Sequence, residues 1–133
     1  MAKYQRISRG KKIKPTYFVF CEGESEDAYI SFLRSHYRVP IQIITKVLRN
    51  KINKASVKRT LSHYPVDSKD KIYLLYDIDI PGMLDKLHSI KDAELLVSNP
   101  CFELWYILHY CNQNSEISTS QCIKKFESLC KNY

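Results

Sequence analysis

Two apolar runs that end in acidic residues constrain the fold of this chain most strongly. Residues 16–21 (Thr-Tyr-Phe-Val-Phe-Cys) and 71–76 (Lys-Ile-Tyr-Leu-Leu-Tyr) have the length and the nearly continuous apolar character of strands buried on both faces. Glu22 follows the first run, and Asp77 and Asp79 follow the second. Ligands of open α/β sheets bind just beyond the carboxyl ends of the strands. The sequence therefore predicts that these carboxylates gather at one edge of a sheet, as an oxygen-rich site for Mg²⁺ or Mn²⁺.

Strand-like and helical patterns alternate along the chain. Ser25 is a suitable N-cap for a helix that runs to about His36. Asn99 is a suitable N-cap for an almost entirely apolar, and therefore buried, helix that runs to about Cys111. The other predicted elements are strands at 41–44 and 93–98, and helices from about 53, after Pro81 and from about 119. This alternation predicts an α/β fold with an open, mainly parallel four-stranded sheet flanked by helices.

The size of the chain and the two ends of the sequence suggest how it is organised. A length of 133 residues is typical of one domain, which we place at residues 15–133. Residues 1–14 carry six basic residues and no acid, and are expected to form a flexible basic arm. The last predicted helix runs almost to the final residue, so we expect that the chain could be truncated at its C-terminus.

Positive charge is concentrated in the first half of the sequence. The net charge is +7, and residues 1–66 hold fourteen of the 21 Lys and Arg residues but only four of the 14 acids. Such a field attracts a polyanion, so nucleic acid is the expected partner, although an ordinary solvated basic surface would look the same. The residues predicted to contact the nucleic-acid backbone are Arg49, Lys51, Lys54, Lys58 and Arg59.

The cysteines and the hydropathy pattern indicate the expected compartment. Five cysteines without CxxC spacing favour free thiols over disulfides or a zinc site. No apolar run approaches the roughly 18 residues of a membrane span, and the first residues do not resemble a secretory signal. We therefore expect a cytoplasmic protein without a membrane partner.

The start of the apolar helix after residue 98 supplies a third group of candidates. Free backbone amides at a helix start can bind phosphate, which nominates Ser98 and Asn99. Glu103 is unusual in an apolar helix, and it is not a capping-box partner, because that position is Phe102. Either the helix dipole stabilises Glu103, or the side chain points at the carboxylate site and takes part in catalysis.

Three segments of the chain resemble motifs of the RloB family. Residues 18–26 (Phe-Val-Phe-Cys-Glu-Gly-Glu-Ser-Glu), followed by Tyr29, are similar to the opening motif of this family, and residues 76–79 (Tyr-Asp-Ile-Asp) to its second. Residues 98–105 (Ser-Asn-Pro-Cys-Phe-Glu-Leu-Trp), followed by Leu-His at 108–109, resemble its third and most distinctive motif. The resemblance covers about residues 16–111.

The resemblance to RloB proteins implies a Toprim-like fold and an activity. In Toprim proteins a Glu after the first strand and an Asp-x-Asp after the third bind Mg²⁺ and act on phosphodiesters, and Glu22, Asp77 and Asp79 match these positions. RloB-like proteins accompany restriction and abortive-infection systems, often beside an ATPase. The resemblance therefore implies a Mg²⁺-dependent nuclease of a bacterial defence system, with Glu22 as a metal ligand or general base and a partner ATPase.

Two alternative functional hypotheses fit the same residues. A receiver-like regulatory domain also has acids after its first strand, an Asp after its third and a Ser or Thr after its fourth, where Ser98 would fit. It needs a Lys after a fifth strand, which the sequence does not predict. The other alternative is a non-catalytic nucleic-acid-binding or scaffold module that partners an ATPase and uses the basic half alone.

Overall fold

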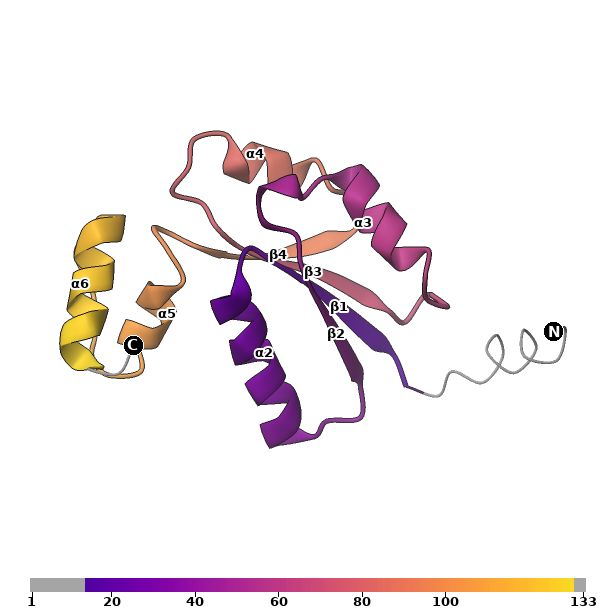
Figure 1. Cartoon of the computed structure of the whole chain (residues 1–133), viewed down its shortest axis with the longest axis horizontal. Helices are drawn as coiled ribbons and strands as arrows, with labels where there is room; N and C mark the ends of the chain where they lie inside the picture. Colours follow the sequence, from indigo (N-terminus) through magenta and orange to yellow (C-terminus); the bar gives the residue numbers. More distant parts are fainter. Residues whose placement is uncertain (1–13, 131–133) are drawn as a thin grey trace, which may run out of the picture.

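The computed structural model describes residues 14–130 and contains one open four-stranded sheet in which every strand is parallel to its neighbours. The strands lie in the order β2-β1-β3-β4 (Figure 1). They are β1 (Thr16–Cys21), β2 (Gln42–Val47), β3 (Lys71–Asp77) and β4 (Ala93–Ser98). This confirms the predicted α/β class, while the likeness to Toprim proteins stays a prediction. The expected arm at 1–14 lies almost wholly outside the described residues.

Helices cover both faces of the sheet (Figure 1). They are α2 (Glu24–Tyr37), the 3₁₀ helix η1 (Arg49–Lys51), α3 (Lys54–Leu61), α4 (Met83–His88), α5 (Glu103–Ile107) and α6 (Thr119–Leu129). On one face, Phe20 and Leu74 pack with Val57 of α3 and Leu87 of α4. On the other face, α2 and the segment before α5 form a second core around Val19, Cys21, Leu75 and Phe102. Burial on both faces explains why the central strands β1 and β3 are so apolar.

A third core lies beyond the sheet and joins α5 to α6. Its buried members are Cys101, Ile107, Cys122 and Phe126. Aromatic contacts link this core to α2. The centroid of the Tyr106 ring lies 5.2 Å from that of Phe126 in α6 and 5.9 Å from that of Tyr29 in α2. These contacts hold α5 beside α2, and α6 packs on α5 (Figure 1).

Two predicted helix starts are wrong. Ser25 lies inside α2, whose N-cap is Gly23. The helix expected to begin at Asn99 and Pro100 begins instead at Glu103 and is only five residues long. Side-chain packing overrides the capping signal here, because Cys101 and Phe102 are consecutive yet buried in two different cores.

The prediction that residues 100–111 form a largely buried helix is also wrong. The side chains of Trp105, Leu108 and Tyr110 are 43%, 46% and 57% exposed. The second strand is longer than predicted and runs to Val47. By contrast, the predicted start of the last helix is confirmed, with a capping box between Ser118 and Gln121.

Two further predictions concern the thiols and the membrane. Cys21, Cys101, Cys111, Cys122 and Cys130 are all free, as the sequence predicted. Within residues 14–130, every helix is too short or too polar to cross a membrane.

Candidate functional site

Three carboxylates converge at the carboxyl edge of the sheet. One ligand oxygen each from Glu22, Glu26 and Asp77 lies within 4.8 Å of the other two. Glu22 directly follows β1, Asp77 ends the neighbouring strand β3, and Glu26 lies in the first turn of α2. We call these three residues the acidic cluster. The prediction that Glu22 and Asp77 lie together at one edge of the sheet is confirmed, while their role as metal ligands stays a prediction.

Backbone hydrogen bonds fix two members of the acidic cluster against each other. The Glu22 amide donates to the Leu75 carbonyl oxygen at 3.2 Å and so extends the pairing of β1 with β3. The Asp77 amide donates to Glu22 Oε1 at 2.9 Å. The Glu22 side chain is therefore held across the ends of both strands, and its position depends on the sheet rather than on a mobile loop.

Glu26 was not singled out from the sequence. Its side chain is only 6% exposed, although α2 is otherwise half-buried or exposed. Its Oε1 lies directly over Gly23, where a Cβ would approach it to 3.4 Å. The available signal was the spacing of four residues from Glu22, which brings two carboxylates together only if the helix begins immediately after the strand.

Burial, and then the crowding of negative charge, raises the pKa of two members of the acidic cluster. The pKa of Asp77 is raised from 3.8 to about 8, chiefly because burial disfavours the charged form. Neighbouring acids raise this pKa further, in decreasing order Glu22, Glu26, Glu103 and Asp79. Burial also raises the pKa of Glu26, as do Glu22 and Glu103, while the backbone amide of Glu26 opposes the shift. A cation would remove this repulsion.

The geometry of the acidic cluster fits a divalent cation. Asp77 Oδ1 is buried and has no hydrogen-bond partner, which is costly unless something else satisfies it. Oxygen ligands lie about 2.0–2.1 Å from Mg²⁺, and three oxygens at most 4.8 Å apart lie at most about 2.8 Å from a common centre. Oxygens within 4.8 Å of one another need to move by less than about 1 Å to share one ion. The acidic cluster could therefore bind a metal, with Glu26 as a third ligand.

Asp79 lies outside the acidic cluster, and its predicted role as a metal ligand stays a prediction. Its side chain is exposed, and its Oδ2 accepts a hydrogen bond of 2.8 Å from Thr119 Oγ1 at the start of α6. Asp79 does contribute to the raised pKa of Asp77. The structure therefore places Asp79 beside the cluster and ties it to the C-terminal helix.

Glu103 lies near the acidic cluster, at the first position of α5. Its charge raises the pKa of both Asp77 and Glu26, so its carboxylate lies within electrostatic reach of the site. Burial, with smaller contributions from Cys122 and Glu103, also raises the pKa of the Cys101 thiol. This location agrees with the interpretation in which Glu103 faces the site from the strand-four side, while its catalytic role stays a prediction.

The predicted nucleic-acid-binding residues are exposed, and part of the group lies next to the acidic cluster. The Leu48 amide donates to the Cys21 carbonyl oxygen at 3.1 Å, directly before Glu22. The Tyr76 hydroxyl donates to the Arg49 carbonyl oxygen at 2.9 Å, directly before Asp77. The exposed basic residues of η1 and α3 are Arg49, Lys51, Lys54, Lys58 and Arg59. We call them the basic segment.

Ser98 and Asn99 lie at the same edge, but the reason for assigning them to phosphate is lost. Ser98 ends β4 opposite Asp77 in the register, and its carbonyl oxygen accepts from the Ile78 amide at 2.9 Å. The helix whose free amides were expected to bind phosphate begins only at Glu103. Phosphate binding by Ser98 and Asn99 thus has no support from a helix terminus.

Comparison with known proteins agrees with the motifs. The family model described as RloB-like protein matches residues 17–133, which is most of the chain. The chain belongs to the RloB-like family. Searches of the curated proteins and of the solved structures returned no significant match. In this RloB-like protein, residues 14–130 contain no fifth strand in the sheet, so they do not provide the lysine position that a receiver domain requires.

Proposed function

We propose that this RloB-like protein cleaves phosphodiester bonds with the help of Mg²⁺ or Mn²⁺ as part of a bacterial defence system. The observation that carries the proposal is the acidic cluster, in which three carboxylates converge and a buried oxygen of Asp77 lacks a partner. The family match and the neighbouring basic segment support it. A partner ATPase remains part of the proposal on the ground of the family resemblance alone.

The residues of the site divide the chemistry between them. Glu22, Glu26 and Asp77 would hold the metal, and Asp77 would release its proton as the metal binds. The metal would neutralise charge on the phosphoryl group and lower the pKa of a bound water. Glu103 would accept a proton from the attacking water, and the leaving oxygen would take up a proton from solvent as its bond to phosphorus breaks.

The basic segment would hold the phosphate backbone beside the acidic cluster. Lys and Arg contacts to phosphate position a nucleic acid without reading its bases. Arg49 and Lys51 belong to η1, whose backbone is bonded next to Asp77 through Tyr76. Lys58 and Arg59 lie in the last turn of α3, farther along the sheet. We therefore propose nucleic acid as the substrate class.

Cleavage is tested with the protein alone and together with the proposed partner ATPase. We expect Mg²⁺- or Mn²⁺-dependent cleavage of single-stranded DNA, duplex DNA or RNA that EDTA abolishes. Glu22→Gln should abolish cleavage and leave nucleic-acid binding intact, because it removes a charge at the metal and none at the basic segment. Glu94→Gln, which changes an exposed residue of β4, is the matched control.

The two possible failures of this test have different meanings. Binding without cleavage by any combination of metal and partner would favour the non-catalytic binding module. Cleavage that survives in Glu22→Gln would show that another site carries the activity.

Nucleic-acid binding should depend steeply on salt. Each neutralised phosphate contributes about −0.7 to −0.9 to the slope of log affinity against log salt concentration. Replacing Lys51, Lys54 and Lys58 by glutamine should therefore make the slope shallower by about 2, as measured by fluorescence anisotropy. The affinity for Mn²⁺ should not change.

A matched triple variant serves as the control for this charge experiment. Lys69, Lys71 and Lys91 are also exposed, but they lie at or just before the first residues of β3 and β4, at the end of the sheet opposite the acidic cluster. Replacing these three should leave the slope nearly unchanged. Equal effects of both triple variants would mean that the protein binds through its overall charge and not through the basic segment.

A further inference from the structure

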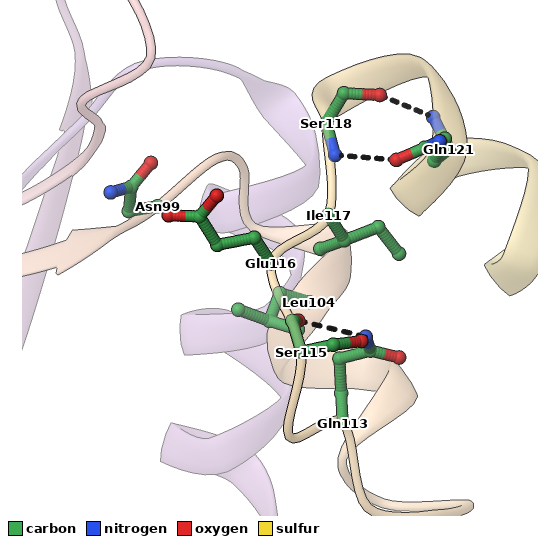
Figure 2. A pocket seen from close by; sticks show the side chains of 8 residues that line it. All are labelled: Asn99, Leu104, Gln113, Ser115, Glu116, Ile117, Ser118 and Gln121. Atoms are coloured by element: carbon green, nitrogen blue, oxygen red, sulfur yellow. Dashed lines mark hydrogen bonds between the residues drawn. The ribbon is translucent and has the colours of Figure 1, made fainter.

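A polar pocket of about 480 Å³ lies between α5 and the N-terminus of α6. Leu104 and Ile117 supply its apolar lining, and amide, hydroxyl and carboxylate side chains surround them (Figure 2). The sequence did not nominate this pocket, and its volume is sufficient for a ligand of several rings.

The pocket adjoins the edge that carries the acidic cluster. On one side it is lined by Asn99, the residue after Ser98, whose carbonyl oxygen is bonded to the Ile78 amide. On the other side it is lined by Ser118, the residue before Thr119, whose hydroxyl donates to Asp79 Oδ2 at 2.8 Å. Asn99 and Ser118 are therefore each next in sequence to a residue that is hydrogen-bonded to the loop after Asp77.

The lining is not suited to a phosphate. Among the residues that line the pocket there is no Lys or Arg. The N-terminus of α6 is already capped, because Gln121 N donates to Ser118 Oγ at 3.2 Å and Ser118 N donates to Gln121 Oε1 at 3.0 Å (Figure 2). The ammonium of Lys125 donates to Gln113 Oε1. An uncharged, planar and polar group matches this lining better than an anion.

Two polar side chains of the pocket remain available to a ligand. Gln113 Nε2 donates to the carbonyl oxygen and the hydroxyl of Ser115, at 3.0 and 3.2 Å. Within residues 14–130, the side chains of Asn99 and Glu116 form no such bond, and Figure 2 shows the Glu116 carboxylate directed toward Asn99. Both side chains are exposed to solvent. Because an ionised carboxylate only accepts hydrogen bonds, a ligand that displaces water from Glu116 would do so best with a pair of adjacent donors.

We propose that this pocket binds the nucleoside next to the scissile phosphate. Guanine offers adjacent N–H donors on its Watson–Crick edge, and ribose offers a pair of hydroxyls, so either part of a nucleotide could satisfy Glu116. Leu104 and Ile117 would pack against the base, and the phosphate would extend toward the acidic cluster. The placement of the phosphate rests on the proposed function, whereas the binding of the nucleoside does not.

The experiment titrates the full chain with GMP, dGMP, AMP and dAMP in EDTA and follows backbone and side-chain amide signals by NMR. We expect the signals of Gln113, Glu116 and Gln121 to shift. Glu116→Gln should weaken nucleotide binding by about five- to tenfold, because the amide replaces one acceptor with a donor. Glu127→Gln, which changes an exposed residue of α6 outside the pocket, should bind as the wild type does.

Each result of the titration has one meaning. Preference for GMP and dGMP assigns the base edge to Glu116, whereas preference for GMP and AMP assigns the ribose diol, and both support the proposal. It is overturned if no nucleotide shifts these signals at 10 mM, if inorganic phosphate reproduces the shifts, or if Glu116→Gln binds as the wild type does. Because EDTA prevents metal-dependent cleavage, nucleotide binding without cleavage would refute only the proposed function, and cleavage without these shifts only the pocket.

Discussion

Asp77→Asn is expected to lower the affinity for Mg²⁺ or Mn²⁺ by at least about 100-fold, more than the loss typical of an outer-shell change. The substitution keeps the volume of the side chain but removes its charge. It also replaces one carboxylate oxygen by an amide nitrogen, at the side chain whose buried Oδ1 has no partner. Glu26→Gln should cause a similar loss, because Glu26 is the third member of the acidic cluster. Isothermal titration calorimetry with Mn²⁺ measures both effects.

Asp92→Asn is the matched control for the change at Asp77. Asp92 has a positive φ of 65°, which asparagine tolerates well, and it lies just before β4 at the opposite edge of the sheet. The Asp92→Asn variant should bind Mn²⁺ with the same affinity as the wild type. If Asp77→Asn and Glu26→Gln also bind Mn²⁺ normally, the acidic cluster is not a metal site.

The metal-free protein is expected to lose stability as the pH rises from about 4 to 8. Asp77 has a pKa of about 8 in the folded state and 3.8 as its ordinary value, so the folded state binds more protons between these values. The stabilising contribution of the protonated group is complete below pH 3.8 and is lost as the pH rises through about 8. Because the side chain is only half-buried, solvent screening reduces the effect to about 1–3 kcal/mol.

Asp77→Asn should therefore stabilise the metal-free protein at pH 8. Differential scanning calorimetry in EDTA should show a melting temperature roughly 3–10 °C above that of the wild type, with a smaller gain at pH 5. With Mn²⁺ present the order should reverse, because only the wild type gains stability from binding the metal. A variant that is less stable than the wild type in EDTA at pH 8 would contradict the electrostatic interpretation of the site.

Local patterns in the sequence were sufficient to predict the sheet. The central strands β1 and β3 are buried on both faces, so their apolar runs end where the sheet ends, and the acids that follow mark its carboxyl edge. The joint position of Glu22 and Asp77 followed from this rule alone.

Other features depended on packing that the sequence does not display. Asn99 looks like an N-cap, but the burial of Cys101 and Phe102 in separate cores delays the helix to Glu103. Glu26 looks like an ordinary surface acid, and only the direction in which α2 leaves β1 turns it toward Asp77. Asp79 was expected to lie with Asp77, yet it is exposed and bonded to Thr119.

The central claim is that Glu22, Glu26 and Asp77 bind one divalent cation, and the most direct test is a crystal structure of the protein with Mn²⁺, using anomalous scattering to locate the metal. We expect an anomalous peak between these three carboxylates, with at least one oxygen of each about 2.2 Å from the ion. An ordered acidic cluster without a peak at millimolar Mn²⁺, or a peak bound only by other residues, would contradict it.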